Sequence, residues 1–374
     1  MNRVGIITRH ISKNYGTMLQ AYAIQKYIEN LGFDCEIIDY RAKDRSMRIK
    51  WLHKIKHFFY AMLTPKKYIM KFTNKKNIIV RNKIFNGFSK TRFRISTKRY
   101  ETMQDLKNDP PDYDIYVCGS DQIWNPYLEY KSPAYFLTFV PEGKKTVAYA
   151  PSIGVSNIGT ENRLEMKDWL KSVQYLSARE KRGCEIIQEI TKRPVELVLD
   201  PVLLHSPEEW DKIAISPELK EPYILCYFLG NVQFFRDFAR EIQKATGYKI
   251  VNLPKSYLEM GSKDHKIYDA GPAEFLGLIK NAAVVCTDSF HGTIFSVNYH
   301  KPFFCFCRTV DTDERSENSR IYNILEVLQL QSRLIKPDIE FSTDMLKLDY
   351  SIAHGLLEHA RYKSAEYIRK ALEQ

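Results

Sequence analysis

The sequence predicts an α/β protein in which two Rossmann-like domains face a central cleft. Two successive series of short β-branched runs, separated by helical patterns, occupy residues 4–200 and 223–304. A chain of 374 residues is also long for a single core. We expect the domains to span residues 1–205 and 206–345, with residues 346–374 forming a helix that packs back across them. The cleft between the strand ends of two such domains is the expected active site.

The N-terminal domain begins with a β-loop-α-β unit. A strand over residues 4–7 leads into a polar loop, a helix extends to about Asn30, and a second strand covers residues 35–40. The glycines of the loop do not follow the G-x-G-x-x-G pattern, so a dinucleotide fingerprint is absent. Asn14, Gly16 and backbone N–H groups could hold an anion at the N-terminus of the helix. The alternative is that Gly16 is a simple turn residue.

Residues 41–99 make this protein basic. They contain 19 Lys and Arg and one acid, Asp44, which gives this segment a net charge of +18. The rest of the chain carries −7, so that the whole chain has a net charge of +11. Aromatic residues are interleaved with the charges, and residues 49–63 have the pattern of a basic amphipathic helix. We expect an insertion that either packs on the domain with a solvated basic face or docks on an anionic membrane surface. Nucleic-acid binding is least favoured, because no recognised motif accompanies the charge.

Polar residues follow the next predicted strand, over residues 114–118. The segment 119–125 combines small, polar and aromatic groups and is typical of the wall of a sugar or phosphate pocket. Trp124 offers a stacking face, and Asp121 can accept hydrogen bonds from sugar hydroxyls or act as a base. The alternative is a capped turn without a ligand.

Two further strand ends complete the N-terminal domain. A strand over residues 147–150 ends before Ser152, and Arg179 follows a short strand or helix end. The planar guanidinium fork of an arginine binds phosphate or carboxylate bidentately, so Arg179 suits an anion site. A solvent-facing pair of Arg179 and Glu180 is the alternative.

The C-terminal domain centres on the junction at residues 284–295. A β-branched run ends in Asp288 and Ser289, and a helical pattern begins at once. His291 would lie on this junction, titratable near neutrality and beside a helix N-terminus that favours anions. The alternative is that Asp288 or Ser289 merely caps the helix and that His291 is a surface residue. Further strands are expected over residues 223–228, 249–253 and 301–304, and helices over residues 234–246, 272–281 and 352–372.

A polar loop beyond the last predicted strand contains Arg308, Arg315 and Arg320 among acidic residues. These arginines could reach an anion site between the domains, although a solvated loop is the alternative for each of them. The seven cysteines lie mostly in apolar runs without a C-x-x-C pair, so we expect reduced packing residues and no metal site. No window approaches the ~18 apolar residues of a membrane span, and no signal peptide precedes the first strand. A cytoplasmic protein is therefore expected.

Six of these stretches together resemble the polysaccharide pyruvyl transferase family. They occur in the order found in the family and extend from residue 14 to residue 292. Each stretch is weak alone, whereas the ordered set is specific. The stretches are NYGTMLQ (14–20), GSDQIWN (119–125), YAPSIG (149–154), SARE (177–180), DPVLL (200–204) and DSFHG (288–292).

The resemblance implies a GT-B-type architecture, similar to certain sialyltransferases, with a C-terminal domain that binds the group donor. It implies phosphoenolpyruvate as co-substrate without a further cofactor, and as acceptor a sugar of a surface polysaccharide, such as a capsule or exopolysaccharide, or of its lipid-linked precursor. Transfer of the enolpyruvyl group would form a pyruvate ketal and release phosphate. Such a protein would be cytoplasmic or peripheral at the inner face of the membrane.

The resemblance also assigns roles to residues. His291 and Arg179 would serve phosphoenolpyruvate, with His291 as acid or base and Asp121 and Glu180 as the next acid or base candidates. Many members carry an arginine where this chain has Ser289, so one anion contact must come from elsewhere. The expected site residues are His291, Arg179 and Asp121 for catalysis; Ser289, Phe290, Gly292, Arg308, Arg315 and Arg320 for phosphoenolpyruvate; and Asn14, Gly16, Gln20, Ser120, Trp124, Asn125, Ser152 and Glu180 for the acceptor.

Two alternatives compete with pyruvyl transfer. One is a GT-B-type glycosyltransferase that uses a nucleotide sugar in the same architecture. The other is a non-catalytic scaffold that attaches a polysaccharide assembly complex to the membrane through residues 41–99. The presence of His291, Arg179 and the loop of Trp124 disfavours the scaffold, because a scaffold has no use for them.

Overall fold

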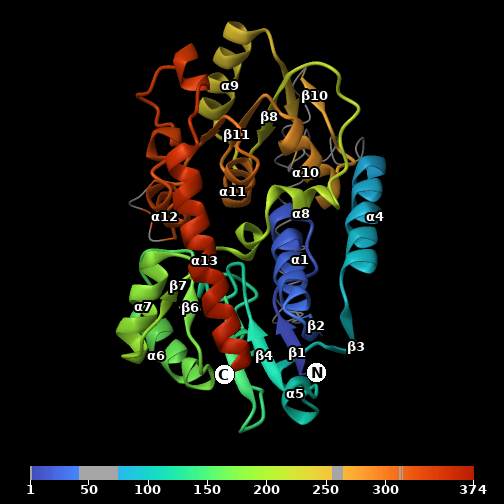
Figure 1. Cartoon of the computed structure of the whole chain (residues 1–374), viewed down its shortest axis with the longest axis vertical. Coiled ribbons are helices and arrows are strands. Elements are labelled where there is room, and N and C mark those ends of the chain that lie inside the picture. Colours follow the sequence, from blue (N-terminus) through green and yellow to red (C-terminus); the bar gives the residue numbers. More distant parts are fainter. Residues whose placement is uncertain (1, 42–74, 255–263, 311–312, 314) are drawn as a thin grey trace, which may run out of the picture.

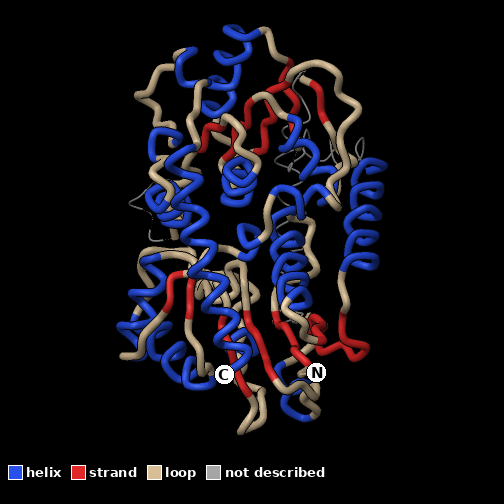
Figure 2. Tube along the Cα trace, viewed as in Figure 1, coloured by secondary structure: helices blue, strands red, loops and turns tan. Residues whose placement is uncertain are grey.

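The computed structural model describes residues 2–41, 75–254, 264–310, 313 and 315–374. These residues form two five-stranded sheets, one in the lower and one in the upper half of Figure 1, and both sheets pair their strands in parallel. Helices lie outside the strands of both sheets (Figure 2). The predicted α/β class with two Rossmann-like domains is confirmed.

The N-terminal sheet has the strand order β3-β2-β1-β4-β5. Its central strands β4 and β1 are buried except for Arg3 at the start of β1, as expected for a parallel sheet that is covered on both faces. The strands are β1 (Arg3–Ile7), β2 (Asp34–Tyr40), β3 (Ile95–Tyr100), β4 (Ile115–Cys118) and β5 (Lys145–Ala148), and a separate pair comprises β6 (Ser177–Ala178) and β7 (Glu196–Leu197). The helices of this half are α1 (Tyr15–Asn30), α4 (Lys75–Arg92), α5 (Met103–Asn108), α6 (Thr160–Trp169) and α7 (Lys181–Thr191).

The C-terminal sheet repeats the same topology in the order β10-β9-β8-β11-β12. Its strands are β8 (Tyr223–Tyr227), β9 (Lys249–Asn252), β10 (His265–Lys266), β11 (Val284–Thr287) and β12 (Phe303–Cys305). Its helices are α8 (Pro207–Asp211), α9 (Gln233–Thr246), α10 (Pro272–Asn281), α11 (Phe290–Asn298) and α12 (Ser319–Val327). The strand order reverses between β1 and β4 in one sheet and between β8 and β11 in the other. Ligands of open α/β sheets bind at such switch points.

Local signals explain where the helices begin and end. Asn14 caps α1 by accepting the N–H of Thr17 through Oδ1, and α9 ends at Gly247, which adopts a φ of 72°. Ser206 and Glu209 form a capping box at α8, whose first residue is Pro207. The end of α9 matches the boundary at residue 246 that the sequence predicts, whereas α1 begins at Tyr15, inside the predicted loop.

The last helix, α13 (Ser351–Glu373), crosses both halves of the molecule, as the red helix of Figure 1 shows. Before its start, Tyr350 donates its hydroxyl to the carbonyl oxygen of Lys301 in the C-terminal half, at 2.7 Å. Further along, Tyr367 donates to the carbonyl oxygen of Ala148 and Ser364 accepts the N–H of Leu199, both in the N-terminal half. The helix therefore ties the two sheets together.

The prediction that residues 41–99 form one insertion is wrong at its C-terminal end. Residues of β3 pair with β2 and extend the N-terminal sheet at its edge. The strand was missed because an edge strand leaves one side in water, so its side chains Thr97, Lys98 and Arg99 are polar and exposed. The predicted basic helix over residues 49–63 lies outside the described residues.

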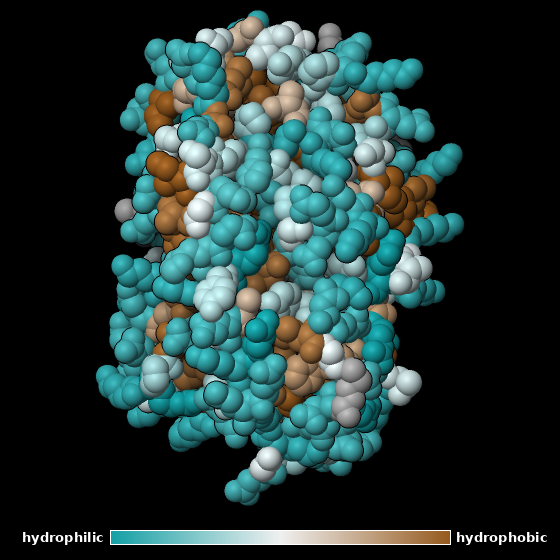
Figure 3. Space-filling model, in the orientation of Figure 1, coloured by the Kyte–Doolittle hydropathy of each residue, from teal (hydrophilic) through white to brown (hydrophobic). Residues whose placement is uncertain are grey.

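The surface visible in Figure 3 is mostly hydrophilic, with apolar side chains in small separate groups. The exposed large apolar residues come from different elements, among them Ile79 of α4, Leu164 of α6 and Ile352 of α13. In the part of the chain that the structure describes, no helix has both the length and the apolar character required to cross a membrane.

Candidate active site

A fully buried arginine lies where the two sheets face one another. Arg179 follows β6, and its Nη1 atom donates to Asp200 Oδ2 at 2.5 Å and to Ser120 Oγ at 3.3 Å. Its Nε atom donates to Glu180 Oε1 at 3.2 Å. The remaining atom, Nη2, is buried 4.0 Å from Asp121 Oδ1 and has no hydrogen-bond partner among the described residues. Leaving such a donor unpaired costs about 1–3 kcal/mol, which a ligand oxyanion would recover.

A histidine from the other domain joins this group. His291 lies in the first turn of α11 and is 6% exposed, and its Nε2 atom stands 3.7 Å from Asp200 Oδ2. That nitrogen is also buried without a hydrogen-bond partner within the described residues. The alternative of a surface histidine is therefore wrong. We call Asp121, Arg179, Glu180, Asp200 and His291 the Arg179 cluster.

Gly16 lets the two domains approach at this point. It lies in the first turn of α1, and a Cβ atom built there would be 2.1 Å from Nδ1 and 2.2 Å from Cγ of His291. Both distances are far below van der Waals contact, so only glycine fits against the imidazole ring. Gly16 is thus a close-contact residue rather than a simple turn residue.

We expect Gly16→Ala to lower the free energy of unfolding by about 1–3 kcal/mol, because the added methyl group overpacks a buried contact. Displacement of His291 should also reduce catalytic turnover, on the order of 10²-fold for a shift of about 1 Å. Urea unfolding and steady-state kinetics measure the two effects. The matched control is Gly355→Ala in α13, where a Cβ atom meets nothing within 4 Å. That substitution should leave activity unchanged and stabilise the protein by about 0.5–1 kcal/mol. Equal behaviour of the two variants would contradict the contact.

Asp121 is held in place by both its backbone and its side chain. It adopts a φ of 64°, its carbonyl oxygen accepts the N–H of Ser152 at 2.9 Å, and its Oδ2 atom accepts the hydroxyl of Thr17 at 2.8 Å. The preceding Gly119 has a φ of 125°, and a Cβ atom there would lie 1.9 Å from the carbonyl oxygen of Tyr149. The strand end after β4 therefore presents Asp121 to Arg179.

The carboxyl groups of the cluster titrate differently. Burial acts to raise the pKa of Asp200, but His291 and Arg179 outweigh it and hold that pKa well below its usual range. The pKa of Asp121 is likewise lowered against burial by Arg179, Arg9 and His291. Burial raises the pKa of Glu180 despite its contact with Arg179. Two carboxylates thus stay ionised, whereas Glu180 is the group best suited to carry a proton.

Two of the three arginines predicted in a polar loop approach this site, although Arg320 lies in the first turn of α12 rather than in a loop. Arg320 is 5% exposed and lies 5.8 Å from the ring centre of Phe290, which Arg179 contacts at 4.6 Å. Glu317 Oε2 accepts from Arg308 Nη2 at 3.0 Å and from Arg320 Nη2 at 2.5 Å. Burial lowers the pKa of Arg320, as do the neighbouring cations. Arg315 is exposed and instead lies 5.6 Å from the ring centre of Tyr127, away from the cluster.

Several predicted site residues shape the site rather than face a ligand. Ser289 caps α11 by accepting the N–H of Gly292, and a Cβ atom at Gly292 would meet Thr287 Oγ1 at 2.4 Å. Gln20 is fully buried, accepts the N–H of Ser120 through Oε1 and donates to three oxygens of the adjoining loop and helix. These residues fix the backbone on which the Arg179 cluster stands.

The predicted stacking role of Trp124 is wrong. Its side chain is 1% exposed, its ring is stacked on Phe136 at 4.9 Å, and its Nε1 atom donates to the carbonyl oxygen of Tyr135. Asn125 is also buried and bonds to Gln122 and to the N–H of Tyr127, which makes it a turn residue. A large aromatic ring after a strand end packs equally well into a core or against a sugar, and the local sequence does not distinguish the two.

Asp200 and Arg9 were not predicted as site residues. Asp200 bonds Arg179, Ser120 and the N–H of Val202, so it is the hub of the cluster. The sequence feature that could have identified Asp200 is its position after a predicted strand and directly before a proline. Arg9 lies after β1, 3.9 Å from the ring centre of Tyr130, and acts on Asp121 through its charge. An arginine in an exposed-looking polar loop gave no signal.

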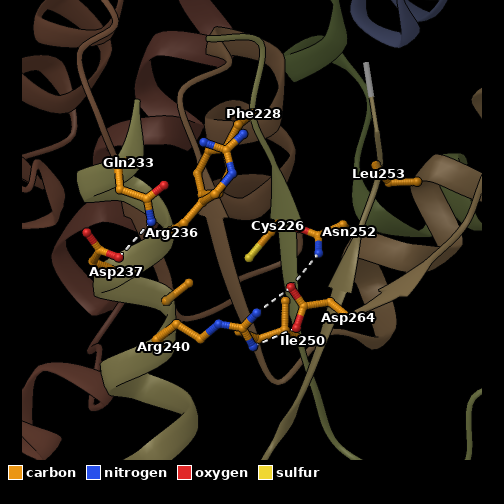
Figure 4. A pocket seen from close by; sticks show the side chains of 11 residues that line it. Cys226, Phe228, Gln233, Arg236, Asp237, Arg240, Ile250, Asn252, Leu253 and Asp264 are labelled. Carbon is orange, nitrogen blue, oxygen red and sulfur yellow. Dashed lines mark hydrogen bonds and ion pairs between the residues drawn. The ribbon is translucent and has the colours of Figure 1, made fainter. Parts of the chain in front are cut away.

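Two of the cavities in the described part of the protein adjoin the end of β8. One of about 250 Å³ lies between α9 and the ends of β8 and β9, and contains none of the predicted site residues (Figure 4). Its polar side chains bond to one another. Asp264 forms an ion pair with Arg240 and accepts a hydrogen bond from Asn252, and Gln233 donates a hydrogen bond to Asp237. The other, of about 410 Å³, lies between the domains beside Asn14.

Known proteins resemble this chain in sequence and in fold. A structure from Listeria monocytogenes, provisionally named a UDP-N-acetylglucosamine 2-epimerase, superimposes with a TM-score of 0.50 at 12% identity, covering 100% of this chain and 96% of its own. An α-glucosyltransferase in complex with UDP gives 0.48 at 9% identity, covering 98% and 95%. The E. coli heptosyltransferase WaaC gives 0.39 at 9% identity, covering 87% and 99%. At 12% identity the Listeria monocytogenes structure bears on the fold alone, and it agrees with the two-domain α/β fold described above.

The sequence comparison is more specific. No curated protein matches the chain. The family described as polysaccharide pyruvyl transferase matches residues 14–306, a range that includes every residue of the Arg179 cluster. Because that range covers most of the chain, this protein belongs to the polysaccharide pyruvyl transferase family.

Proposed function

We propose that this protein transfers the enolpyruvyl group of phosphoenolpyruvate to a sugar of a surface polysaccharide or of its lipid-linked precursor, forming a pyruvate ketal. One observation carries the proposal. Arg179 Nη2 and His291 Nε2 are buried beside the same Asp200, at the meeting point of the two domains, and neither has a hydrogen-bond partner among the residues that the structure describes. Two unpaired polar groups of this kind suit an anionic substrate that has acid–base chemistry nearby.

Phosphoenolpyruvate offers a phosphate and a carboxylate to these groups. One oxyanion would accept from Arg179 Nη2. The other would meet Arg320, which approaches the same Phe290 ring, and Arg308, which shares Glu317 with Arg320. The N-terminus of α11 adds its positive dipole end next to His291. This arrangement would supply the anion contact that Ser289 does not.

The reaction needs two proton movements. The methylene carbon of phosphoenolpyruvate gains a proton and becomes the methyl group, and a first sugar hydroxyl attacks the oxocarbenium-like C2. A second hydroxyl then displaces phosphate from C2. One of the two hydroxyl protons replaces the proton that was added to the methylene carbon, and the other leaves with phosphate. His291 is our assignment for proton transfer, and Glu180 is the alternative because its pKa is raised by burial.

Glu317 offers a test of where phosphoenolpyruvate binds. Its carboxylate occupies Arg308 and Arg320, so an incoming anion must compete with it. We expect Glu317→Gln to lower the KM for phosphoenolpyruvate by up to about fivefold, the equivalent of the ~1 kcal/mol of a partly exposed ion pair, at similar kcat. Steady-state kinetics with varied phosphoenolpyruvate measures this. A higher KM would show instead that Glu317 holds the arginines in their binding positions.

The decisive experiment is phosphate release from phosphoenolpyruvate in the presence of a panel of aryl and lipid-linked galactosides and N-acetylhexosamines. Release that depends on an acceptor, with a pyruvate ketal identified by mass spectrometry, supports the proposal. No release with any acceptor, together with no rise in melting temperature on adding phosphoenolpyruvate, would reject it. Flotation with anionic liposomes tests the peripheral membrane location, and absence of binding at low salt would reject that part.

A further inference from the structure

The cavity of about 410 Å³ between the domains has the size of a small-molecule site, for which about 300–1,000 Å³ is usual. Its walls come from the loop before α1, the first two turns of α4, the end of β8, and the residues Pro254 and Tyr268. Both domains therefore contribute to it. The sequence singled out only one of its lining residues, Asn14.

The cavity lies at the same end of α1 as His291. Asn14 lines the cavity and caps α1, and Gly16, two residues later, touches the His291 ring. On the other wall, Leu229 donates its N–H to Asp288 Oδ1 at 2.6 Å, and Asp288 precedes His291 by three residues. A ligand in this cavity would thus sit next to the Arg179 cluster without occupying it.

The charges in the cavity have one sign. Among its described lining residues, Lys13 and Arg81 are cations and none is acidic. Arg81 donates through Nη1 to the carbonyl oxygen of Pro254 at 2.9 Å, while its Nε atom is buried without a partner in the described part of the chain. Burial and the charge of Arg81 lower the pKa of Lys13. Two cations that repel one another, one with an unused donor, favour a bound anion.

Other features of the cavity fit a sugar. Ser12, Asn77 and Asn82 supply polar side chains, and the half-buried ring of Tyr268 offers an apolar surface of the kind on which sugar rings stack. The surrounding surface attracts anions, because α4 contains six Lys and Arg and no acid. The combination of hydroxyl-binding groups, an aromatic ring and two cations is characteristic of a site that binds an acidic glycan.

We infer that this cavity binds the acceptor, and that it selects a sugar carrying an oxyanion, either a phosphate or a carboxylate, which Lys13 and Arg81 hold. The inference rests on the proposed function, since it places an acceptor beside bound phosphoenolpyruvate. The bound oxyanion fixes the position of the sugar, and the free hydroxyls of the sugar extend past Asn14 toward His291.

Calorimetric titration of the full chain tests the inference with defined probes. N-acetylglucosamine 1-phosphate represents a phosphate-linked sugar and glucuronic acid a carboxylate-bearing sugar, while N-acetylglucosamine, glucose and inorganic phosphate are the references. We expect at least one acidic sugar to bind about tenfold or more tightly than its neutral counterpart and than inorganic phosphate, and the two acidic probes distinguish the anions. Saturating phosphoenolpyruvate should not displace the bound acidic sugar.

Variants localise the binding. Arg81→Gln and Lys13→Gln should each weaken binding of the acidic sugar about fivefold to twentyfold. Lys90→Gln, an exposed cation of the same helix outside the cavity, should leave binding unchanged. Lys13 is exposed, so its variant remains informative if Arg81→Gln fails to fold.

Equal binding of neutral and acidic sugars would overturn the inference, as would binding of the acidic sugar that neither Arg81→Gln nor Lys13→Gln weakens. Displacement of the acidic sugar by phosphoenolpyruvate would also overturn it, because the sugar would then lie in the Arg179 cluster. Thermal stabilisation by phosphoenolpyruvate alone is measured in parallel. Failure of that response together with no phosphate release, but with intact sugar binding, rejects the proposed function and keeps the glycan site. The reverse pattern rejects the glycan site only.

Discussion

Replacing Arg179 with methionine should lower the free energy of unfolding by about 3–5 kcal/mol near neutral pH, the cost of breaking a buried ion pair from one side. Methionine keeps most of the volume but removes the cation that Asp200, Glu180 and Asp121 share. Binding of phosphoenolpyruvate should be lost as well, because Nη2 is our principal anion contact. Urea unfolding and thermal stabilisation by phosphoenolpyruvate measure the two effects.

The stability deficit of Arg179→Met should shrink as the pH falls. In the unmodified protein the folded pKa of Asp200 lies below its unfolded value, so its contribution is present above about pH 3.9 and is lost as the pH falls through the folded value. Without Arg179, the folded pKa values of Asp200, Glu180 and Asp121 should rise, because less charge then opposes the effect of burial. Folding then takes up protons, and the variant gains stability from pH 7.5 to pH 5.5. A deficit that is constant over this range would contradict the proposed coupling.

The matched control for this prediction is Arg182→Met, only three residues away. Arg182 makes partly exposed ion pairs with Glu185 and Glu189 on α7. Such pairs contribute about 0–1 kcal/mol, so this variant should unfold nearly as the unmodified protein does and keep its response to phosphoenolpyruvate. The comparison separates loss of a buried cation from loss of any arginine.

His291→Gln should reduce acceptor-dependent phosphate release about 10²- to 10⁴-fold, the usual contribution of one acid–base group. Stability should change little, because Nε2 has no hydrogen bond to lose among the described residues. The measurement is kcat together with the melting temperature. Retained turnover would transfer the proton role to Glu180.

His205→Gln provides the converse control for His291. His205 is also buried, but its Nε2 atom bonds the carbonyl oxygen of Ala23 at 2.9 Å and its ring packs against Trp210, outside the Arg179 cluster. Loss of this bond should cost about 1–3 kcal/mol of stability and leave the turnover of the folded protein unchanged. Opposite behaviour of the two histidine variants would identify His291 as a functional group rather than a core residue.

Sequence alone predicted the elements that local patterns encode. The junction before His291 and the strand before Asp121 are short buried runs that end in small and polar residues, so their type and approximate bounds follow from periodicity and capping. The helix α13 also appears where its apolar stripe predicts it. The family followed from ordered motifs, whose spacing a single chain displays without any structure.

Tertiary structure decided which side chains face the cleft. Asp200, Arg179 and His291 are separated by 21 to 112 positions, more than any local pattern spans. The packing of α11 against α1 through Gly16 brings His291 to the other two. Trp124 lies in the core although its motif looks like a pocket wall, and β3 is a strand although its charges suggest an insertion. Side-chain type sets what a residue can bind, whereas burial and long-range contacts set what it meets. The sequence therefore determined the fold class and the family, and the folded chain determined the site.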